Sequence, residues 1–281
     1  MAKKFPMGAW VYNPITDFTP DEVDVWADMG LTVTMCGTVD YDNAELLLPF
    51  LDRAQARDIR LIVWVYGIGD ARRDEDDYKA RFKALYENKL RKHPALYGFF
   101  IGDEPSSHDA AEYMIAEMKA QKDVAPELHP YINLMGSTCG NGSIYPGKTY
   151  PEFLADIKER TACESFCFDV YDQTINDGGV TNFYATMKDQ NEAANIAGID
   201  CWATLLQVRI GHTEYQRNIS LLGQFLTRLH LAARALCGSD YTTERSRRNI
   251  TAHPSMNLAL RQSSITDLCV AKRSSRSILV R

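Results

Sequence analysis

Long apolar runs are missing from this sequence. Along its 281 residues no window approaches the roughly eighteen consecutive apolar residues that a membrane-spanning helix requires. The opening residues 1–6 include two lysines but no apolar stretch behind them, so this chain shows no signal peptide. We therefore expect no membrane contact and, for the chain as given, a cytoplasmic protein; a leader removed beforehand is the open alternative.

An excess of positive charge is also absent. The 31 lysines and arginines are outnumbered by 37 aspartates and glutamates, for a net charge of −6. No basic stripe offers the counterion release that drives binding to a nucleic-acid backbone, so no nucleic-acid partner is expected. The sequence does not indicate the oligomeric state.

Cysteines are few and lie in no metal-binding pattern. The seven cysteines are an odd number, and several, such as Cys167, sit inside apolar runs. Cys163 and Cys167 lie four residues apart, but no second pair and no histidine cluster completes a zinc site. We expect reduced, structural cysteines and neither a metal nor another cofactor.

Short apolar runs alternate with amphipathic stretches. The runs cover residues 5–12, 31–39, 59–68, 96–101, 128–135, 165–171 and 199–208. They are rich in β-branched and aromatic residues and lack a polar face, which is typical of strands buried on both sides. With helical patterns between them, the runs predict seven β-then-α units and therefore a parallel sheet with helices outside it.

The predicted fold class is α/β, a (β/α)8 barrel of the TIM type over residues 1–243. A doubly wound open sheet usually carries a glycine-rich phosphate turn after its first strand, and this chain has Tyr12-Asn-Pro-Ile-Thr16 there. The eighth unit is the irregular part, because its best strand candidate is the weak segment 235–243. Residues 244–281 form a basic tail without aromatic residues, which is either poorly ordered or atypical, for instance through a reading-frame change.

Polar and aromatic residues gather at the predicted C-terminal ends of the strands, where such barrels build their active sites. The predicted substrate-binding residues are Asp103, Trp10, Tyr12, Trp64, Tyr66, Asn133, Tyr171, Trp202 and Gln207. Rings beside carboxylates and amides suit a neutral polyhydroxylated ligand, whose C–H faces stack on aromatics while its hydroxyls form hydrogen bonds. The alternative is that many of these rings fill the barrel interior.

The strongest signal is the segment Leu96-Tyr-Gly-Phe-Phe-Ile-Gly-Asp-Glu-Pro105. Two acids at the end of a buried strand are costly to desolvate unless they have partners or a task. Period-two alternation places Glu104 on one face with Gly98, Phe100 and Gly102, and the glycines would leave open space beside it. The alternative role, capping the next helix, already belongs to Ser106 or Ser107. We therefore predict that Glu104 is catalytic.

This segment resembles a known signature. Gly-Asp-Glu-Pro at the end of strand four is similar to the Asn-Glu-Pro motif of barrel glycoside hydrolases, and most of all to uncharacterised bacterial glycosyl hydrolases. The likeness spans residues 5–210 and is strongest at 96–105 and at Phe168-Asp-Val-Tyr171. The resemblance implies that Glu104 is the general acid/base. Asp103 occupies the position of the asparagine.

The chain differs from these glycoside hydrolases at the position of the catalytic nucleophile. Those enzymes place a second glutamate at the end of strand seven, where this chain has Gln207. The chitinase-like series of aspartates is also absent, since Tyr97, Phe100 and Gly102 fill its positions. The second catalytic carboxylate is therefore assigned to Asp169 at the end of strand six, and the remaining candidates are Asp172, Asp40 and Asp70.

Three functions remain in competition. The first is a glycoside hydrolase that acts on an oligosaccharide or glycoside, with Glu104 as proton donor. The second is a carbohydrate-binding barrel that has lost turnover, which the missing strand-seven glutamate favours. The third is a magnesium-dependent hydrolase or lyase built on Asp103, Glu104 and Asp169.

Overall fold

The computed structural model describes residues 6–136, 141–169, 179–206 and 267–271. The strands are β1 (Met7–Trp10), β2 (Val33–Asp40), β3 (Arg60–Tyr66), β4 (Leu96–Asp103), β5 (Tyr131–Met135), β6 (Ser165–Asp169), β7 (Asp200–Leu206) and β8 (Asp267–Ala271). The α-helices are α1 (Glu22–Asp28), α2 (Leu48–Ala56), α3 (Glu75–Lys83), α4 (His108–Val124), α5 (Tyr150–Thr161) and α6 (Gly179–Ala197). None of these helices is long and apolar enough to cross a membrane.

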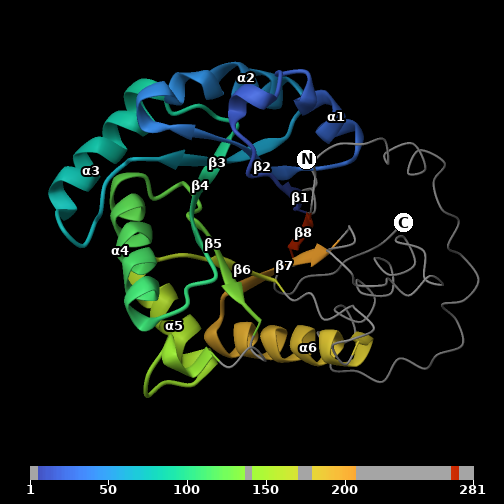
Figure 1. Cartoon of the computed structure of the whole chain (residues 1–281), viewed down its shortest axis with the longest axis vertical. Coiled ribbons are helices and arrows are strands. Elements are labelled where there is room, and N and C mark those ends of the chain that lie inside the picture. The colour runs from blue at the N-terminus through green and yellow to red at the C-terminus, as the bar shows by residue number, and fades with distance from the viewer. Residues whose placement is uncertain (1–5, 137–140, 170–178, 207–266, 272–281) are drawn as a thin grey trace, which may run out of the picture.

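The strands form one closed sheet with the helices outside it (Figure 1). Its order is β1-β8-β7-β6-β5-β4-β3-β2, and the five adjacent pairs from β2–β3 to β6–β7 are parallel. The ring closes between β1 and β2, where Thr32 N donates to Met7 O at 2.8 Å and Ala9 N donates to Thr34 Oγ1 at 3.0 Å. The chain is thus a barrel of the (β/α)8 type, as predicted.

The eighth strand departs from the βα repeat. β8 runs antiparallel between β1 and β7 and pairs with both, so β1 keeps the direction of the other six strands. The segment 235–243, suggested by the sequence for this position, lies outside the described residues. β8 comes instead from the 244–281 tail, of which the structure describes these five residues. Five residues of this tail thus pair with two strands of the barrel.

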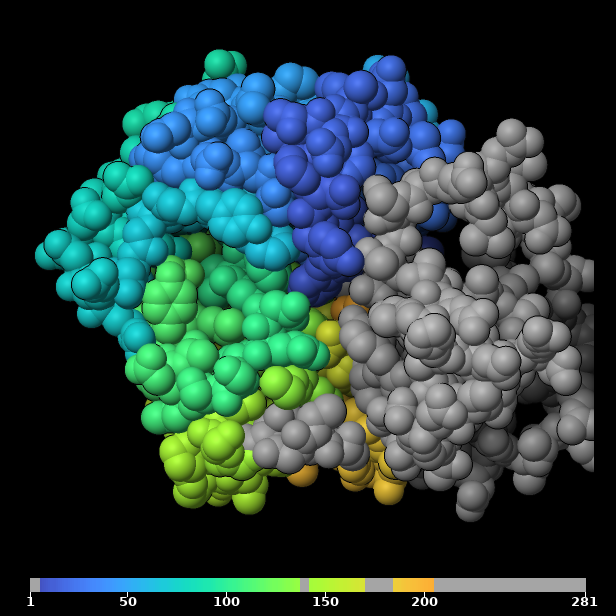
Figure 2. Space-filling view, in the orientation of Figure 1, coloured from blue at the N-terminus to red at the C-terminus, as the bar shows by residue number. Residues whose placement is uncertain are grey.

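The chain order of the βα units is also their order in space. The space-filling view shows the blue, cyan, green and yellow segments side by side in sequence (Figure 2).

Two features of the sequence set the helix ends. Gly30 and Gly198 adopt φ values of +84° and +67° just after α1 and α6, which favours glycine. Ser107 caps α4, accepting a hydrogen bond from Ala110 N at 3.1 Å.

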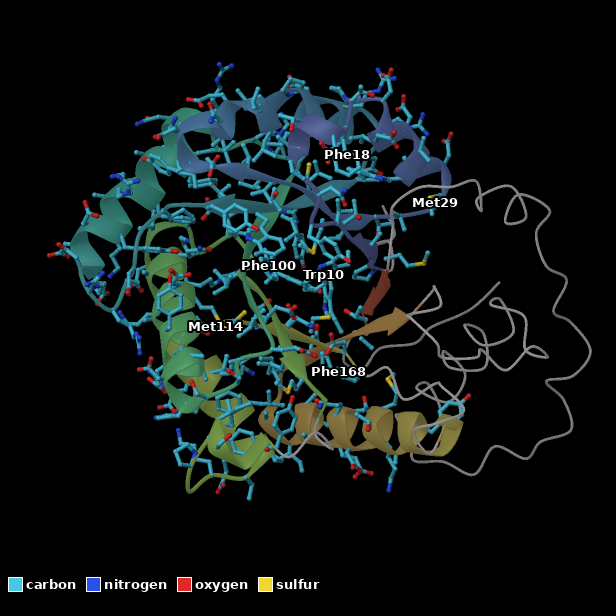
Figure 3. The ribbon with its side chains drawn as sticks, in the orientation of Figure 1. Trp10, Phe18, Met29, Phe100, Met114 and Phe168 are labelled. Atoms are coloured by element: carbon cyan, nitrogen blue, oxygen red, sulfur yellow. The ribbon has the colours of Figure 1, made fainter. Side chains whose placement is uncertain are left out.

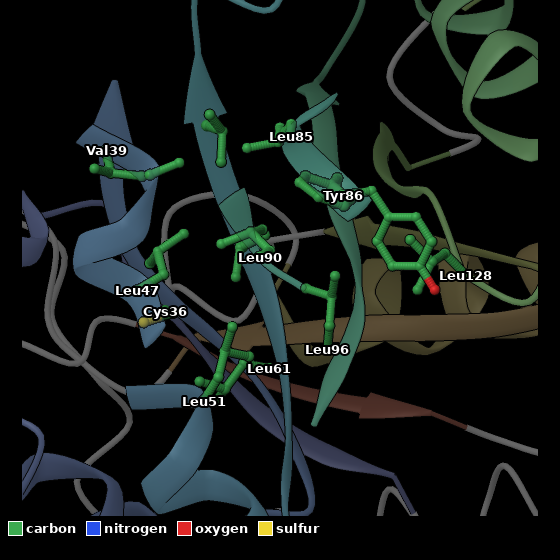
Figure 4. Close-up of a cluster of buried hydrophobic side chains, with 14 of the residues drawn as sticks. Cys36, Val39, Leu47, Leu51, Leu61, Leu85, Tyr86, Leu90, Leu96 and Leu128 are labelled. Carbon is green, nitrogen blue, oxygen red and sulfur yellow. The ribbon is translucent and has the colours of Figure 1, made fainter. Parts of the chain in front are cut away.

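A first apolar core lies between the strands and the N-terminal helices (Figure 4). Leu61 of β3 lies there against Leu51 of α2, and Leu96 of β4 is buried in the same cluster. Phe82 of α3 meets Phe99 of β4 edge to face, with ring centroids 5.0 Å apart. Each such buried side chain stabilises the fold by about 1.5–3 kcal/mol. A second cluster packs α4, α5 and α6 against β5, β6 and β7.

A third cluster fills the barrel interior. Its members are Trp10, Val11, Val33, Met35, Ile62, Phe100, Tyr131, Cys167 and Trp202. Trp10 and Phe100 lie together at the centre of the ring of strands, with ring centroids 5.4 Å apart (Figure 3). The barrel is therefore packed through its middle, and a ligand can be held only at an end.

Candidate active site

A bulge near the end of β4 decides which of its side chains face the barrel interior. Phe100 of β4 pairs with Tyr131 of β5, and Gly102 pairs with Ile132. Because Tyr131 and Ile132 are adjacent, β4 carries one extra residue between the two pairs. Phe100 packs in the interior cluster. Gly102 faces outward, because a Cβ there would collide with the Met114 side chain of α4 (Figure 3 labels Met114). The alternation is shifted by one residue, and the interior position falls to Asp103.

The bulge overturns the predicted register of Glu104. The sequence placed Glu104 on one face with Phe100 and Gly102, beside open space left by two glycines. Gly98 instead lies against the backbone of His129, and Gly102 against Met114. Glycine is needed at Gly98, where backbone atoms occupy the volume of a side chain, whereas the space beside Gly102 is filled by the flexible Met114 side chain.

Glu104 stands directly after β4, at the C-terminal end of the barrel. Its N–H donates to Asn133 O at 2.9 Å, which continues the pairing with β5. Its φ is +36°, a left-handed conformation that costs free energy for any residue with a side chain. The side chain is exposed, and within the described ranges no hydrogen bond or ion pair holds its carboxylate.

Asp103 faces its neighbours across β4, β5 and β6. Asn133 Nδ2 donates to Asp103 Oδ1 at 2.8 Å. Protein atoms crowd the Asp103 carboxylate, although the residue keeps an exposed side, and this loss of water raises its pKa above the usual range. The hydrogen bond from Asn133 lowers that pKa, while the negative charge of Asp169 raises it.

The next two strands continue the polar layer. On β5 the interior residues alternate with Ile132 and Leu134, which belong to the outer core, so Asn133 points inward and is 1% exposed. On β6, Phe166 and Phe168 lie in the outer core, so Asp169 also points inward. Asp169 is 6% exposed. Asp103, Asn133 and Asp169, here called the acceptor floor, thus lie on three successive strands of the interior face.

The structure adds one residue that the sequence reasoning missed. Thr204 of β7 pairs in register with Asp169 of β6, is 1% exposed, and its Oγ1 lies 3.3 Å from Cys167 Sγ. Trp202 is in the interior cluster, and alternation along β7 therefore turns Thr204 inward. The same alternation could have identified it from the sequence.

Two of the predicted aromatic residues are available to a ligand. Tyr12, just after β1, is 52% exposed, and Tyr66, the last residue of β3, is 46% exposed. Trp64 lies under Tyr66, with ring centroids 5.3 Å apart, and its other neighbour is Phe100 at 4.2 Å. Tyr66 with Trp64 behind it forms an aromatic surface on the β3 side of the barrel end.

Two other predicted rings are part of the interior packing. Trp10 and Trp202 are each 5% exposed and belong to the interior cluster. Trp202 is also near the start of β7, not its end, and its ring neighbours Tyr97 near the start of β4, with centroids 5.7 Å apart. Trp202 therefore lies in the N-terminal half of the barrel, and its predicted contact with substrate is wrong.

Three residues named from the sequence cannot be placed. Tyr171, Asp172 and Gln207 lie outside the described residues. Among those that the structure does describe, no group of three histidine, cysteine, aspartate or glutamate side chains is arranged to hold a metal ion.

Comparison with known proteins bears on the fold. No model of a known protein family matches the chain, and neither does any curated protein. Among solved structures it is similar to a putative alpha-L-fucosidase from Bacteroides thetaiotaomicron VPI-5482, at 14% identity and a TM-score of 0.55, over 84% of this chain and 83% of the other. It is also similar to a GH18 chitinase from Pseudoalteromonas aurantia, at 10% identity and a TM-score of 0.48, over 68% and 76%.

A third similar structure is a GH10 endoxylanase from a sugarcane soil metagenome. Its identity to this chain is 9% and its TM-score 0.46, over 81% of each chain. At such low identity the first of these likenesses shows the fold alone. The chain has a barrel fold that is also found among glycoside hydrolases.

Proposed function

We propose that the protein is a glycoside hydrolase and that Glu104 donates the proton to the leaving oxygen. The observation that carries this proposal is the left-handed backbone of Glu104, with φ +36°, at the C-terminal end of β4. Strain of this kind persists where the surrounding structure enforces it, and it is concentrated at active sites. Here it presents an exposed carboxylate at the end of the barrel where such folds do their chemistry.

The second carboxylate in this proposal is Asp169. As the glycosidic C–O bond breaks, the leaving oxygen takes the Glu104 proton and the anomeric carbon is attacked from the other face. In a retaining mechanism Asp169 itself forms the new bond; in an inverting one a water forms it and Asp169 takes the water's proton. Carboxyl separations of about 5–5.5 Å and about 6.5–9.5 Å distinguish the two mechanisms.

The exposed aromatic residues support a carbohydrate substrate. Tyr66 and Tyr12 stand at the C-terminal ends of β3 and β1, close to the plane at which Glu104 emerges from β4. Aromatic faces stack on the C–H faces of sugars, and each ring presents a hydroxyl for a directed hydrogen bond. An oligosaccharide or glycoside meets both requirements.

The test is Glu104→Gln, assayed on an oligosaccharide and on an activated aryl glycoside. The amide keeps the shape but has no proton to donate, and general acid catalysis contributes about 10²–10⁴-fold. We expect the larger loss on the oligosaccharide, because an aryl leaving group needs little protonation. Asp169→Asn should slow both substrates. Glu159→Gln, an exposed glutamate of α5, is the matched control and should change neither rate. Wild-type turnover in Glu104→Gln on both substrates would contradict the assignment.

A carbohydrate-binding barrel without turnover is the second candidate. One observation favours it: in β7, as described from Asp200 to Leu206, the only carboxylate is Asp200 at the start of the strand. The C-terminal end of β7, where a nucleophile would act, thus carries no carboxylate within the described residues. Oligosaccharide binding with no hydrolysis of any glycoside by the wild type would select this candidate.

A further inference from the structure

We propose that Arg72 is a positioning residue for Glu104, on which it acts through Asp109 at the start of α4. The inference deepens the proposed function and rests on it for the effect on turnover, but not for the effect on the backbone of Glu104. The juxtaposition that supports it is the segment after β3, which lies against the first two turns of α4. Only residues 105–107 separate Glu104 from this helix.

The backbone of Glu104 needs support on both sides. Its φ of +36° is a left-handed conformation, and the proline that follows favours an extended backbone in the residue before it. Such conformations persist only where the surrounding structure enforces them. On the side of β4 the support is the hydrogen bond from Glu104 N to Asn133 O at 2.9 Å. On the other side the chain leads directly into α4, so the support there depends on what holds the start of that helix.

Arg72 holds the start of α4 with both ends of its guanidinium group. Nη1 donates to Asp109 Oδ1 at 2.6 Å, and Nη2 donates to Asp109 Oδ2 at 3.2 Å. Nη1 also donates to the backbone oxygen of Asp109 at 3.1 Å. One turn further along α4, the guanidinium carbon lies 5.6 Å from the centre of the Tyr113 ring. This two-point pairing fixes direction as well as distance, and a lysine could not reproduce it.

The segment that carries Arg72 is itself held in place. Asp70 Oδ1 accepts a hydrogen bond from Arg72 N at 2.9 Å, a local turn that aspartate favours. Arg81 of α3 donates from Nε to Ile68 O at 2.6 Å and from Nη2 to Gly67 O at 2.9 Å. Through these contacts the start of α4 is tied to the end of β3, the strand that pairs with β4.

A second contact holds the same turn of α4 from the other side. His108 Nδ1 donates to Ile144 O at 3.0 Å, which is a single hydrogen bond. The pair between Arg72 and Asp109 has two hydrogen bonds between charged groups, which are the stronger kind, so we assign the larger part of the support to Arg72. The Asp109 side chain is 81% exposed, and exposed ion pairs contribute little to the stability of the fold. Loss of the pair should therefore loosen Glu104 without unfolding the barrel.

The first test measures the Glu104 amide by ¹⁵N relaxation. A rigid amide has an order parameter of about 0.85, and a flexible one has a value below about 0.6. We expect a rigid Glu104 amide in the wild type, and in Arg72→Met an order parameter lower by at least about 0.1. Asp109→Ala should act in the same direction. Arg53→Met, which breaks a two-point pair with Asp24 between α2 and α1, is the matched control. All three variants should melt within about 4 °C of the wild type.

The second test is kinetic. On the oligosaccharide, Arg72→Met should lower kcat about tenfold and leave KM within about twofold, because the proton donor is misplaced while the binding surface is intact. The loss on the activated aryl glycoside should be smaller, as for Glu104→Gln. In the Glu104→Gln background Arg72→Met should cause no further loss, since no proton remains to be positioned. A residue that merely stabilises the fold would slow both substrates alike and would act in both backgrounds.

Three results would each overturn the inference. The first is an unchanged order parameter of Glu104 in Arg72→Met, or an equal fall in Arg53→Met. The second is wild-type turnover of the oligosaccharide by Arg72→Met, and the third is an equal loss of turnover with and without Glu104→Gln. If Arg72→Met does not fold, Asp109→Ala removes the same pair from the other partner, and the same measurements on that variant decide.

Failure of this inference and failure of the proposed function give different results. If Glu104→Gln abolishes hydrolysis but Arg72→Met changes neither turnover nor the Glu104 amide, the inference fails and the hydrolase stands. If Arg72→Met loosens the Glu104 amide but the wild type cleaves no glycoside, the proposed function fails and the support of Glu104 by Arg72 stands.

Discussion

Asn133 Nδ2 donates a 2.8 Å hydrogen bond to Asp103 Oδ1, across the neighbouring strands β5 and β4. Asn133 is buried in the barrel interior, whereas Asp103 keeps an exposed side. The bond therefore connects a rigid interior amide to a carboxylate that solvent or ligand can reach. It lowers the pKa of Asp103, against the loss of water and the charge of Asp169, which raise it.

Two substitutions should move the pKa of Asp103 in opposite directions. Asn133→Leu has nearly the same size but no donor, so the pKa of Asp103 should rise. Asp169→Asn removes the neighbouring negative charge, so the pKa should fall. Carboxyl ¹³C NMR titration of Asp103 measures both. Asn195→Leu, on an exposed position of α6, is the control and should leave the titration unchanged. Shifts of the same sign in the two variants would show that the floor is not arranged as described.

A second titrating carboxyl is built into α4, away from the acceptor floor. Glu117 is 8% exposed, and burial raises its pKa to about 7, although a hydrogen bond from Tyr113 opposes the shift and the charge of Asp70 adds to it. A carboxyl whose pKa is raised by folding binds its proton more tightly in the folded state. Stability should therefore be lost as pH rises from about 4.5 to about 7.

Glu117→Gln should remove this pH dependence. The amide can still accept from Tyr113, and at pH 8 it avoids a buried charge, so we expect a gain of about 1–3 kcal/mol in the free energy of unfolding. At pH 5 the wild-type side chain is itself protonated, and the gain should shrink. Urea unfolding at the two pH values measures the difference, with Glu159→Gln of α5 as the exposed control. An equal effect at both pH values would exclude titration of Glu117 as the cause.

Much of the barrel could be predicted from the sequence because its strands are buried on both faces. Continuous runs of β-branched and aromatic residues predicted seven strands, and the structure has β1 through β7 inside or near each run. The caps were also visible: Gly30, Gly198 and Ser107 end or begin helices as their residue types favour. These are local effects, set by neighbouring residues in the chain.

The candidate site depended on features that are not local. The bulge in β4 is a property of its pairing with β5, and the sequence contains no sign of it. A one-residue shift then turned Asp103 toward the barrel interior, where the alternation had placed Glu104. The position of Trp202 was misjudged for a related reason, because the predicted run 199–208 does not tell which of its residues lies at the active end.

The tail offers the last test. β8 pairs with β1 on one side and β7 on the other, so its loss would leave the backbone groups of two strands without partners. We expect a chain ending at residue 266 to melt at least about 4 °C below the full chain, where roughly 1 kcal/mol corresponds to about 2–4 °C. A chain ending at residue 271 keeps β8 and is the matched control, because it removes ten residues that carry four positive charges and no aromatic ring. It should melt within about 2 °C of the full chain. Equal melting of the two truncated chains would show that β8 does not close the barrel.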